Sequence, residues 1–321
     1  MKKKIFITGG AGTIGSSFIK NYYNDYKFIS YSRNEKMQVS LKRSFNNVEI
    51  ILGAVEDKIS LSNAILKTKP DVIIHAAALK HVDTGEITPI QTVKSNIIGS
   101  LNIIECSLEH NIPITIGIST DKACLPEQNY GYSKLLMEKM FLEANNDRNK
   151  FSVCRFGNVT HSHGSVLPFW LRLKANNETL KLTDSRMNRL MFSQKEAVDL
   201  VHTLLKLTEE NKGGFILSKK MKTVNMLELA RVISDKVEEV GIRPGEKLDE
   251  TLISVDEIPY TFIDGDFIKI DKFINPNIDN RLKDEYSSLT AEKMNIEEMI
   301  DMVAETDKNL KKSLFKYGIY G

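Results

Sequence analysis

Three glycines spaced three residues apart constrain the fold of this chain more than any other feature. Gly9, Gly12 and Gly15 follow an apolar run typical of a strand, residues 4–8, and a helical pattern opens at Ser16. Glycines at such a turn let the backbone approach a pyrophosphate, and the positive end of the new helix attracts the phosphate charge. The segment therefore predicts a dinucleotide-binding unit. We expect its cofactor contacts at Gly9, Gly12, Thr13, Ile14 and Gly15.

Short apolar runs alternate with longer helical patterns through the first half of the chain. The runs that we expect to form strands are residues 4–8, 27–32, 48–52, 71–75, 114–119 and 152–156. This alternation is typical of an α/β fold with a doubly wound parallel sheet (the Rossmann fold), in which ligands bind beyond the carboxyl ends of the strands.

The alternation of strand and helix patterns ends after residue 163, where prolines are scattered among short segments. We therefore expect residues 1–163 to form the dinucleotide-binding Rossmann domain and residues 164–321 to form mainly a smaller, carboxyl-terminal substrate-binding lobe. A helical pattern near residues 194–207 is expected to return to the large domain.

The composition excludes several classes of protein. Among 321 residues, 44 basic and 42 acidic side chains leave a net charge of +2, too small for a protein that coats nucleic acid or a membrane surface. The run from Ile5 to Ile7 is too short for a signal peptide or a membrane span, which favours the cytoplasm. Because the cysteines are odd in number and lack metal-type spacing, we expect Cys106, Cys124 and Cys154 to be reduced and non-catalytic.

The end of the second expected strand indicates which dinucleotide the chain prefers. No acidic residue stands where an NAD-binding protein would hold the ribose hydroxyls, and Ser32, Arg33 and Asn34 are found there instead. The Arg33 guanidinium and the Ser32 hydroxyl suit a 2′-phosphate, so the sequence predicts NADP. An ordinary solvated arginine is the alternative for Arg33.

A second group of polar residues lies at the end of the fifth expected strand and on the following helix. Thr120, Asp121 and Lys122 come first, and Tyr130 and Lys134 lie four residues apart on one helix face. A lysine ammonium can lower the pKa of a phenol, whose tyrosinate then takes a hydroxyl proton as hydride leaves the same carbon. The glycine motif favours this catalytic interpretation over a surface ion pair or a core tyrosine.

Several longer stretches of the chain resemble one known family. They are residues 77–82 (AALKHV), 119–123 (STDKA), 155–159 (RFGNV), 164–168 (GSVLP) and 241–247 (GIRPGEK). They are similar to stretches of the polysaccharide-biosynthesis UDP-sugar dehydratases, a branch of the extended short-chain dehydrogenase/reductase superfamily. Tyr130 stands where the membrane-anchored, configuration-retaining members carry Met. The nearer resemblance is therefore to the inverting UDP-N-acetylglucosamine 4,6-dehydratases of pathways such as that of pseudaminic acid.

The resemblance implies a role for each residue of the second polar group. Tyr130 and Lys134 would handle oxidation at carbon 4 of the sugar, and Thr120 would bind the sugar. Lys122 would remove the proton on carbon 5, which the carbon 4 ketone makes acidic, and Asp121 would protonate the departing carbon 6 hydroxyl. A solvent-facing ion pair is the alternative for Asp121 and Lys122.

The resemblance also implies which residues bind the substrate and the rest of the cofactor. Lys80 and Arg243 would contact the diphosphate of UDP-N-acetylglucosamine or a related UDP-hexose, and Glu246 its ribose. Further substrate contacts are implied at Asn158 and Val166, and further cofactor contacts at Val55, Ala76 and Ala78. Asn96 matches a structural asparagine of the superfamily. Because relatives assemble as homo-oligomers, we expect the same here.

Four positions depart from the family pattern. Ala54 replaces an Asp that contacts adenine, and Asp83 replaces a Pro; His163 replaces an Arg beside the substrate phosphates, and His161 replaces a small residue. The two histidines lack a third metal ligand, so we expect no metal. Two other functions stay open. One is a UDP-sugar 4-epimerase, which needs the Tyr–Lys pair but not the Asp–Lys pair, and the other is a non-catalytic NADP- or nucleotide-sugar-binding regulator.

Overall fold

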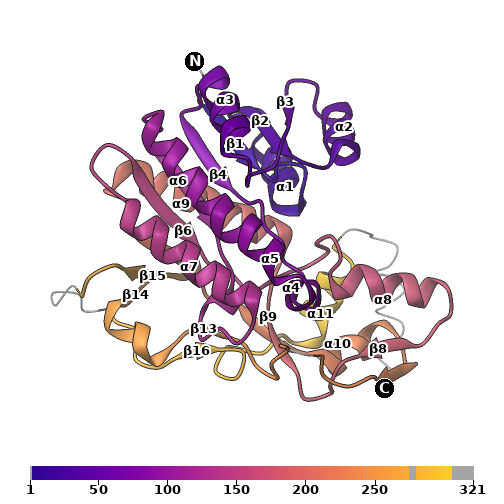
Figure 1. Cartoon of the computed structure of the whole chain (residues 1–321). Helices are drawn as coiled ribbons and strands as arrows, with labels where there is room; N and C mark the ends of the chain where they lie inside the picture. Colours follow the sequence, from indigo (N-terminus) through magenta and orange to yellow (C-terminus); the bar gives the residue numbers. More distant parts are fainter. Residues whose placement is uncertain (1, 244, 275–279, 306–321) are drawn as a thin grey trace.

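A nine-stranded sheet organises most of the chain in the computed structural model, which describes residues 2–243, 245–274 and 280–305 (Figure 1). Its strands, in spatial order, are β14 (Thr261–Asp264), β15 (Phe267–Asp271), β10 (Phe215–Lys219), β6 (Lys150–Cys154), β5 (Ile114–Ile118), β4 (Val72–His75), β1 (Lys4–Thr8), β2 (Lys27–Ser32) and β3 (Glu49–Leu52). The strands from β10 to β3 are parallel, and β15 is antiparallel to both of its neighbours. The sheet reverses its direction of growth at β1, which places a ligand site beyond the carboxyl ends of the strands there.

Helices cover both faces of this sheet (Figure 1). Neighbouring helices α3 (Lys58–Thr68), α6 (Gly99–Glu109) and α7 (Asn129–Ala144) line one face, whereas α1 (Thr13–Tyr22) and α9 (Gln194–Glu210) pack together on the other. Helix α2 (Glu35–Ser44) lies beside β2 and β3. Between β4 and α6 come α4 (Val82–Ile87), α5 (Pro89–Thr92) and the π-helical turn η1 (Val93–Ile98). Within the described ranges, no helix is both long enough and apolar enough to cross a bilayer.

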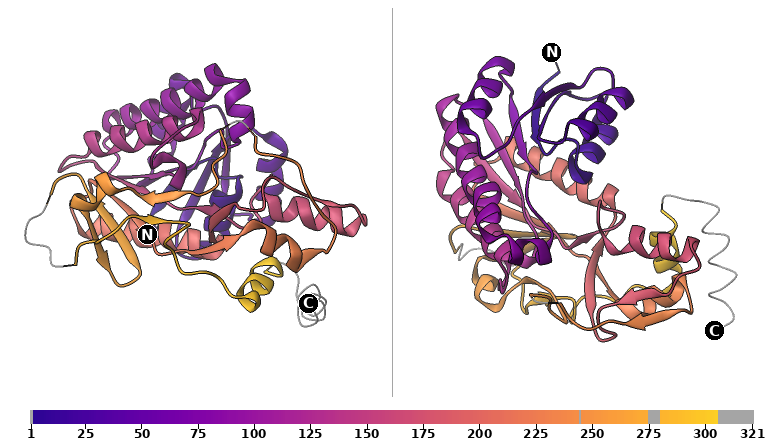
Figure 2. Two further views of the ribbon diagram at one scale, coloured as in Figure 1. Left: turned by 90° about the horizontal axis from the view of Figure 1, so that it is seen from below. Right: turned by 45° about the vertical axis from the view of Figure 1, so that its right-hand side comes forward.

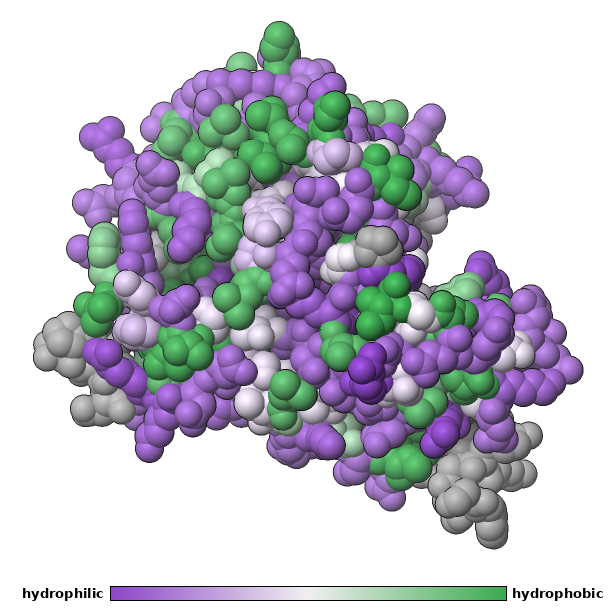
Figure 3. Space-filling model, turned by 60° about the horizontal axis from the view of Figure 1, so that its bottom comes forward, coloured by the Kyte–Doolittle hydropathy of each residue, from purple (hydrophilic) through white to green (hydrophobic). Residues whose placement is uncertain are grey.

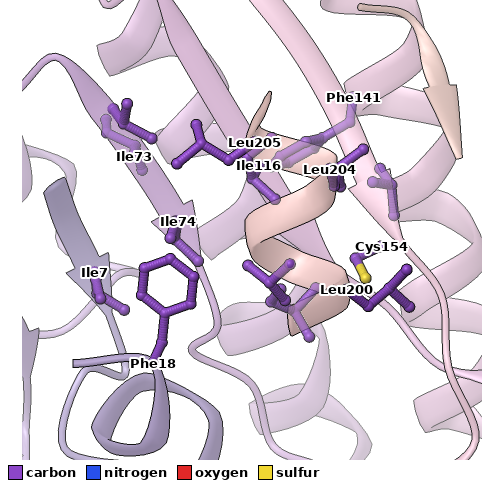
Figure 4. Close-up of a cluster of buried hydrophobic side chains, with 14 of the residues drawn as sticks. Ile7, Phe18, Ile73, Ile74, Ile116, Phe141, Cys154, Leu200, Leu204 and Leu205 are labelled. Carbon is purple, nitrogen blue, oxygen red and sulfur yellow. The ribbon is translucent and has the colours of Figure 1, made fainter. Parts of the chain in front are cut away.

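The main core lies between the central strands and the helices (Figure 4). Ile7, Ile74 and Ile116, from three adjacent strands, are fully buried, and Phe18 of α1 and Leu200 of α9 pack against the same part of the sheet. Strands covered on both faces need apolar residues without alternation, which explains the continuous apolar runs in the sequence.

A smaller lobe follows β6 and lies beside the carboxyl ends of the sheet strands (Figure 2). Its strands are β7 (Asn158–Val159), β8 (Leu180–Leu182), β9 (Asn188–Phe192), β11 (Lys222–Asn225), β12 (Val237–Glu239), β13 (Thr251–Ile253) and β16 (Tyr286–Ser287). They form a three-stranded sheet, β11-β9-β7, and the pairs β12-β8 and β13-β16. Its helices are α8 (Val166–Ala175), α10 (Met226–Ile233), α11 (Ile296–Val303) and the 3₁₀-helix η3 (Val255–Tyr260). A separate apolar cluster, which includes the buried Trp170, stabilises this lobe.

The α/β fold class is confirmed, and most differences from the sequence prediction lie at element ends. Helix α1 begins at Thr13, three residues before the expected Ser16, and α9 extends to Glu210. Residues 89–109 fold as α5, the π-helical turn η1 and α6 in succession. We did not expect β10, β14 and β15, which return to the large sheet from the second half of the chain. All three cysteines are buried free thiols.

Arg155, directly after β6, joins the large sheet and α7 to the segment that contains β13 and η3. Its guanidinium donates to both carboxylate oxygens of Glu138 in α7, at 2.9 and 2.6 Å, and to both of Glu257 in η3, at 2.9 and 2.8 Å. It also donates to the carbonyl of Leu252 at 2.9 Å. Arg155 and Glu138 are each only 1% exposed, so every charge in this cluster depends on its partners.

We predict that Arg155→Ala lowers the free energy of unfolding by about 3–5 kcal/mol, because it leaves the Glu138 carboxylate buried without its cation. Chemical denaturation followed by circular dichroism measures this change. Lys195→Ala, which removes an exposed ion pair with Asp199, is the control and should cost less than about 1 kcal/mol. Equal effects of the two substitutions would contradict the role given to Arg155.

Candidate active site

The loop between β1 and α1 has the geometry of a pyrophosphate cradle. Gly9 has a φ of +66°, and a Cβ there would lie 2.9 Å from the backbone nitrogen of Ala77. A Cβ on Gly15 would lie 2.5 Å from the Cα of Gly10, because the first turn of α1 packs directly on the loop. Both positions therefore require glycine.

The amino-terminal end of α1 can receive an anion. Its N-cap residue, Gly12, has an extended backbone and no side chain that could accept from the first turn. The N–H groups of this turn, which includes Thr13 and Ile14, lie at the positive end of the helix dipole. Together with the close-packed glycines, this end fits the pyrophosphate of a dinucleotide.

The three residues at the end of β2, Ser32, Arg33 and Asn34, differ in their hydrogen-bond partners. Arg33 is half exposed and donates to Glu56 Oε1 at 2.9 Å, so its guanidinium is held near the ends of β2 and β3. Ser32 is the last residue of β2. Asn34 caps α2, because its side-chain oxygen accepts from the backbone N–H of Met37 at 3.0 Å. The cap accounts for Asn34 without a ligand.

The other expected cofactor residues lie around the ends of β3 and β4. Val55 is buried, and its carbonyl accepts from the side chain of Asn102 at 2.9 Å. Ala76 donates its N–H to the carbonyl of Thr8 at 3.1 Å, and Ala78, two residues further on, is half-buried. The carbonyl of Ala54 accepts from the Tyr31 hydroxyl at 3.1 Å.

A short 3₁₀ turn after β5, η2 (Asp121–Ala123), carries the Asp–Lys pair. Asp121 is fully buried, and its Oδ1 accepts from the Thr120 hydroxyl at 2.8 Å, from the Lys122 N–H at 2.8 Å and from Lys122 Nζ at 3.2 Å. Its other oxygen, Oδ2, has no hydrogen-bond partner among the described residues. The pair is therefore not a solvent-facing ion pair.

A residue that the sequence analysis did not single out completes this group. Glu250, immediately before β13, is 3% exposed, and its Oε1 lies 3.1 Å from Lys122 Nζ. Burial alone would lower the pKa of Lys122, but the carboxylates of Asp121 and Glu250 raise it above its ordinary value. Lys122 therefore carries its proton at neutral pH. No local pattern around residue 250 could have revealed this contact, because the fold brings the two segments together.

Tyr130 and Lys134 lie on α7 as expected, but their electrostatic surroundings differ from the prediction. Burial raises the pKa of Tyr130 to about 12, and the cation that lowers it is Lys122, together with a hydrogen bond to Thr120. Lys134 Nζ lies 3.0 Å from the sulfur of Met137, and burial lowers its pKa to about 8. Asn96 accepts from the N–H of Leu79 and donates to the Ser133 hydroxyl, which ties the loop after β4 to α7.

The expected substrate residues come from several segments. Lys80 Nζ lies 3.3 Å from the Ser162 hydroxyl, so the loop after β4 meets the segment between β7 and α8. Asn158 begins β7, and Val166 begins α8. Arg243 forms an ion pair with Glu246 at 2.9 Å and lies 4.0 Å from Asp83.

The two histidines of the 158–166 segment have separate partners. His163 Nδ1 lies 2.8 Å from the hydroxyl of Thr13, which joins this segment to the glycine-rich loop. His161 Nε2 lies 3.0 Å from the carbonyl of Met302, in α11.

The outline of the molecule is notched between the larger body and the smaller lobe (Figure 3).

Comparison with curated proteins gives two informative relatives. The chain is 39% identical to a UDP-N-acetylglucosamine 4,6-dehydratase (inverting) of Campylobacter jejuni, over 81% of this chain and 80% of the relative. It is 31% identical to a UDP-glucose 4-epimerase of Rickettsia bellii, over 95% of this chain and 96% of the relative.

Two solved structures share the fold of this chain. The structure of Pen from Bacillus thuringiensis superposes with a TM-score of 0.88 at 28% identity, covering 95% of this chain and 98% of that chain. The dTDP-glucose 4,6-dehydratase DesIV from Streptomyces venezuelae, solved with NAD, has a TM-score of 0.68 at 18% identity, covering 76% and 86%, and shares the fold. The family model described as polysaccharide biosynthesis protein matches residues 5–270. This chain therefore belongs to the polysaccharide biosynthesis protein family.

Proposed function

We propose that this chain is an NADP-dependent UDP-N-acetylglucosamine 4,6-dehydratase that inverts the configuration at carbon 5. The observation that carries the proposal is the buried Asp121–Lys122 pair next to Tyr130, because dehydration needs an acid and a base beyond the tyrosine. The Campylobacter jejuni relative, with the same activity in its name, supports it. The product would be a UDP-2-acetamido-2,6-dideoxy-4-keto-hexose.

A bound nicotinamide cofactor would supply the hydride acceptor for carbon 4 and the hydride donor for carbon 6. Tyr130 takes the proton of the carbon 4 hydroxyl. Its pKa stays raised even with the charge of Lys122 beside it, so the phenol must give up its own proton before the tyrosinate can accept that of the carbon 4 hydroxyl. Lys134, on the same helix, has a pKa that burial lowers to about 8, and it can therefore exchange a proton at mildly alkaline pH.

Asp121 and Lys122 carry out the elimination. Lys122 removes the proton on carbon 5, and Asp121 delivers a proton to the carbon 6 hydroxyl as it departs. The unpartnered Oδ2 of Asp121 supports this assignment, because one carboxylate oxygen stays available to the substrate while Oδ1 is held by Thr120 and Lys122.

The nucleotide would be bound by the loops that surround this group. Lys80 and Arg243 are the cations for the diphosphate, Glu246 would accept from the ribose, and Asn158 and Val166 would contact the substrate near β7 and α8. Arg243 already forms a partly exposed ion pair with Glu246, which costs little to rearrange when a phosphate arrives.

One observation favours a second candidate, a UDP-sugar 4-epimerase. The Rickettsia bellii relative is named a UDP-glucose 4-epimerase, and it matches 95% of this chain. An epimerase would use the Tyr–Lys pair but would leave the buried Asp121–Lys122–Glu250 group without a task. Product analysis with UDP-N-acetylglucosamine separates the two, because an epimer keeps its carbon 6 hydroxyl.

We predict that Tyr130→Phe lowers kcat at least about a hundredfold, because it removes a positioned acid–base group. The substitution deletes one phenolic oxygen, so thermal unfolding and NADP binding should stay unchanged. Tyr132→Phe is the matched control, since Tyr132 lies on the same helix and is 55% exposed. A Tyr130→Phe enzyme within tenfold of the wild type would refute the assignment.

The second prediction concerns proton transfer at carbon 5. Turnover of UDP-N-acetylglucosamine in heavy water should place solvent deuterium at carbon 5 with inverted configuration, read by proton NMR. Lys122→Ala should block this incorporation because the base is lost. Lys139→Ala, an exposed change on α7, should leave it intact. Retention of the original configuration would contradict the inverting assignment.

Arg33→Asp should move cofactor preference from NADP toward NAD, because a carboxylate repels the 2′-phosphate that the guanidinium would attract. The dissociation constants of both dinucleotides, measured by calorimetry, give the ratio. Arg148→Asp, an equal charge change on an exposed loop, controls for net charge. An unchanged ratio in Arg33→Asp would place Arg33 outside the cofactor site.

A further inference from the structure

Glu250 is held rigidly at the point where the smaller lobe meets the catalytic turn. Its backbone N–H donates to the Ser288 hydroxyl at 3.0 Å, and its carbonyl accepts from the Ser288 N–H at 2.8 Å. With both backbone groups fixed and the residue 3% exposed, the carboxylate has little freedom to move away from Lys122.

Lys122 Nζ lies between two carboxylates. Glu250 Oε1 is 3.1 Å away and Asp121 Oδ1 is 3.2 Å away, and both acidic side chains are buried. Arg189 and Tyr130 are the other titratable groups that act on this ammonium or are acted on by it. The two carboxylates and the ammonium form a buried triad with a net charge of −1 when all three are ionised.

We propose that Glu250 is a positioning residue that completes a proton-transfer triad with Asp121 and Lys122. It holds the amine of Lys122 in place and stabilises the ammonium that forms when Lys122 takes the carbon 5 proton. The inference rests on the proposed dehydratase function. It adds to the Asp–Lys pair a third member from a segment distant in the sequence.

The triad balances the protons of the elimination without solvent. One proton first passes from Lys122 Nζ to the carboxylate of Asp121, whose Oδ1 lies 3.2 Å away, and leaves a neutral amine and a carboxylic acid. The amine lone pair then takes the carbon 5 proton, the carbon 5 electron pair forms the double bond to carbon 6, and the carbon 6–oxygen bond breaks. The proton of Asp121 leaves with that oxygen as water. Lys122 is again an ammonium and Asp121 again a carboxylate.

This sequence explains why a second carboxylate is needed. Once Asp121 holds the proton it is neutral and no longer attracts the charge that grows on Lys122. Glu250 is then the carboxylate in contact with Nζ. An anion in contact with an amine increases its basicity, and it does so more strongly in a buried setting.

The test is Glu250→Gln, which keeps the shape of the side chain and removes its charge. We expect kcat to fall at least about tenfold with KM little changed, because acid–base groups contribute about a hundredfold or more. In the profile of kcat against pH, the fall in kcat at high pH (the alkaline limb) reports loss of the proton that the triad shares. Because Glu250 raises the pKa of Lys122, removing its charge should move that limb to lower pH by about one pH unit or more.

Two further variants control the experiment. Glu250→Asp retains the charge and should shift the limb less than half as far as Glu250→Gln. Asp249→Asn removes the neighbouring carboxylate, which accepts from Asn188 and Ser288, and should leave the limb near its wild-type position. Circular dichroism and thermal unfolding verify that each variant is folded.

The outcomes separate the two proposals. A wild-type product that keeps its carbon 6 hydroxyl overturns the dehydratase proposal and the triad with it. Wild-type dehydration with an unshifted limb in Glu250→Gln overturns the triad alone, as does an equal shift in Asp249→Asn. Wild-type dehydration with the shift confined to the Glu250 variants, and reduced in Glu250→Asp, supports both.

Discussion

The geometry of the site depends on the hydrogen bonds that the buried Arg155 guanidinium (here called the Arg155 fork) donates to two glutamates and a carbonyl. The Arg155 fork binds Glu138 on α7, the helix that carries Tyr130, and it binds Glu257 and the carbonyl of Leu252, which follow Glu250 along the chain. The distance between Lys122 and Glu250 is therefore set from outside the η2 turn. Since buried charges tolerate few arrangements, the fork favours one relative position of helix and lobe.

Two lysines of the site differ in their pKa values because, among the described residues, only one of them contacts carboxylates. Lys134 is buried beside the sulfur of Met137, and its pKa falls to about 8. Lys122 is also shielded from water, yet two carboxylates reverse the effect of burial and raise its pKa. Sequence spacing made Lys134 the expected partner of the Tyr130 phenol, whereas in the structure Lys122 is the cation that lowers the pKa of Tyr130.

The sequence was sufficient to predict the parts of the molecule that depend on local pattern. Buried parallel strands require continuous apolar runs, and the glycine loop requires residues without side chains, so both could be recognised. The strands β14 and β15 could not, because short strands at a sheet edge lack a distinctive pattern. Glu250 and the Arg33–Glu56 ion pair depend on contacts between distant segments, which spacing does not encode. The residue roles within the site stay predictions until they are tested.

The unpartnered oxygen of Asp121 also has a consequence for the stability of the protein. Folding removes this acceptor from water without giving it a donor among the described residues, at a cost of about 1–3 kcal/mol. A chain selected for stability alone would replace Asp121 with an apolar residue of similar volume. Under the proposed function its presence is a stability–activity trade-off, in which the fold tolerates this local cost so that the substrate meets a carboxyl oxygen that is already dehydrated and fixed in position.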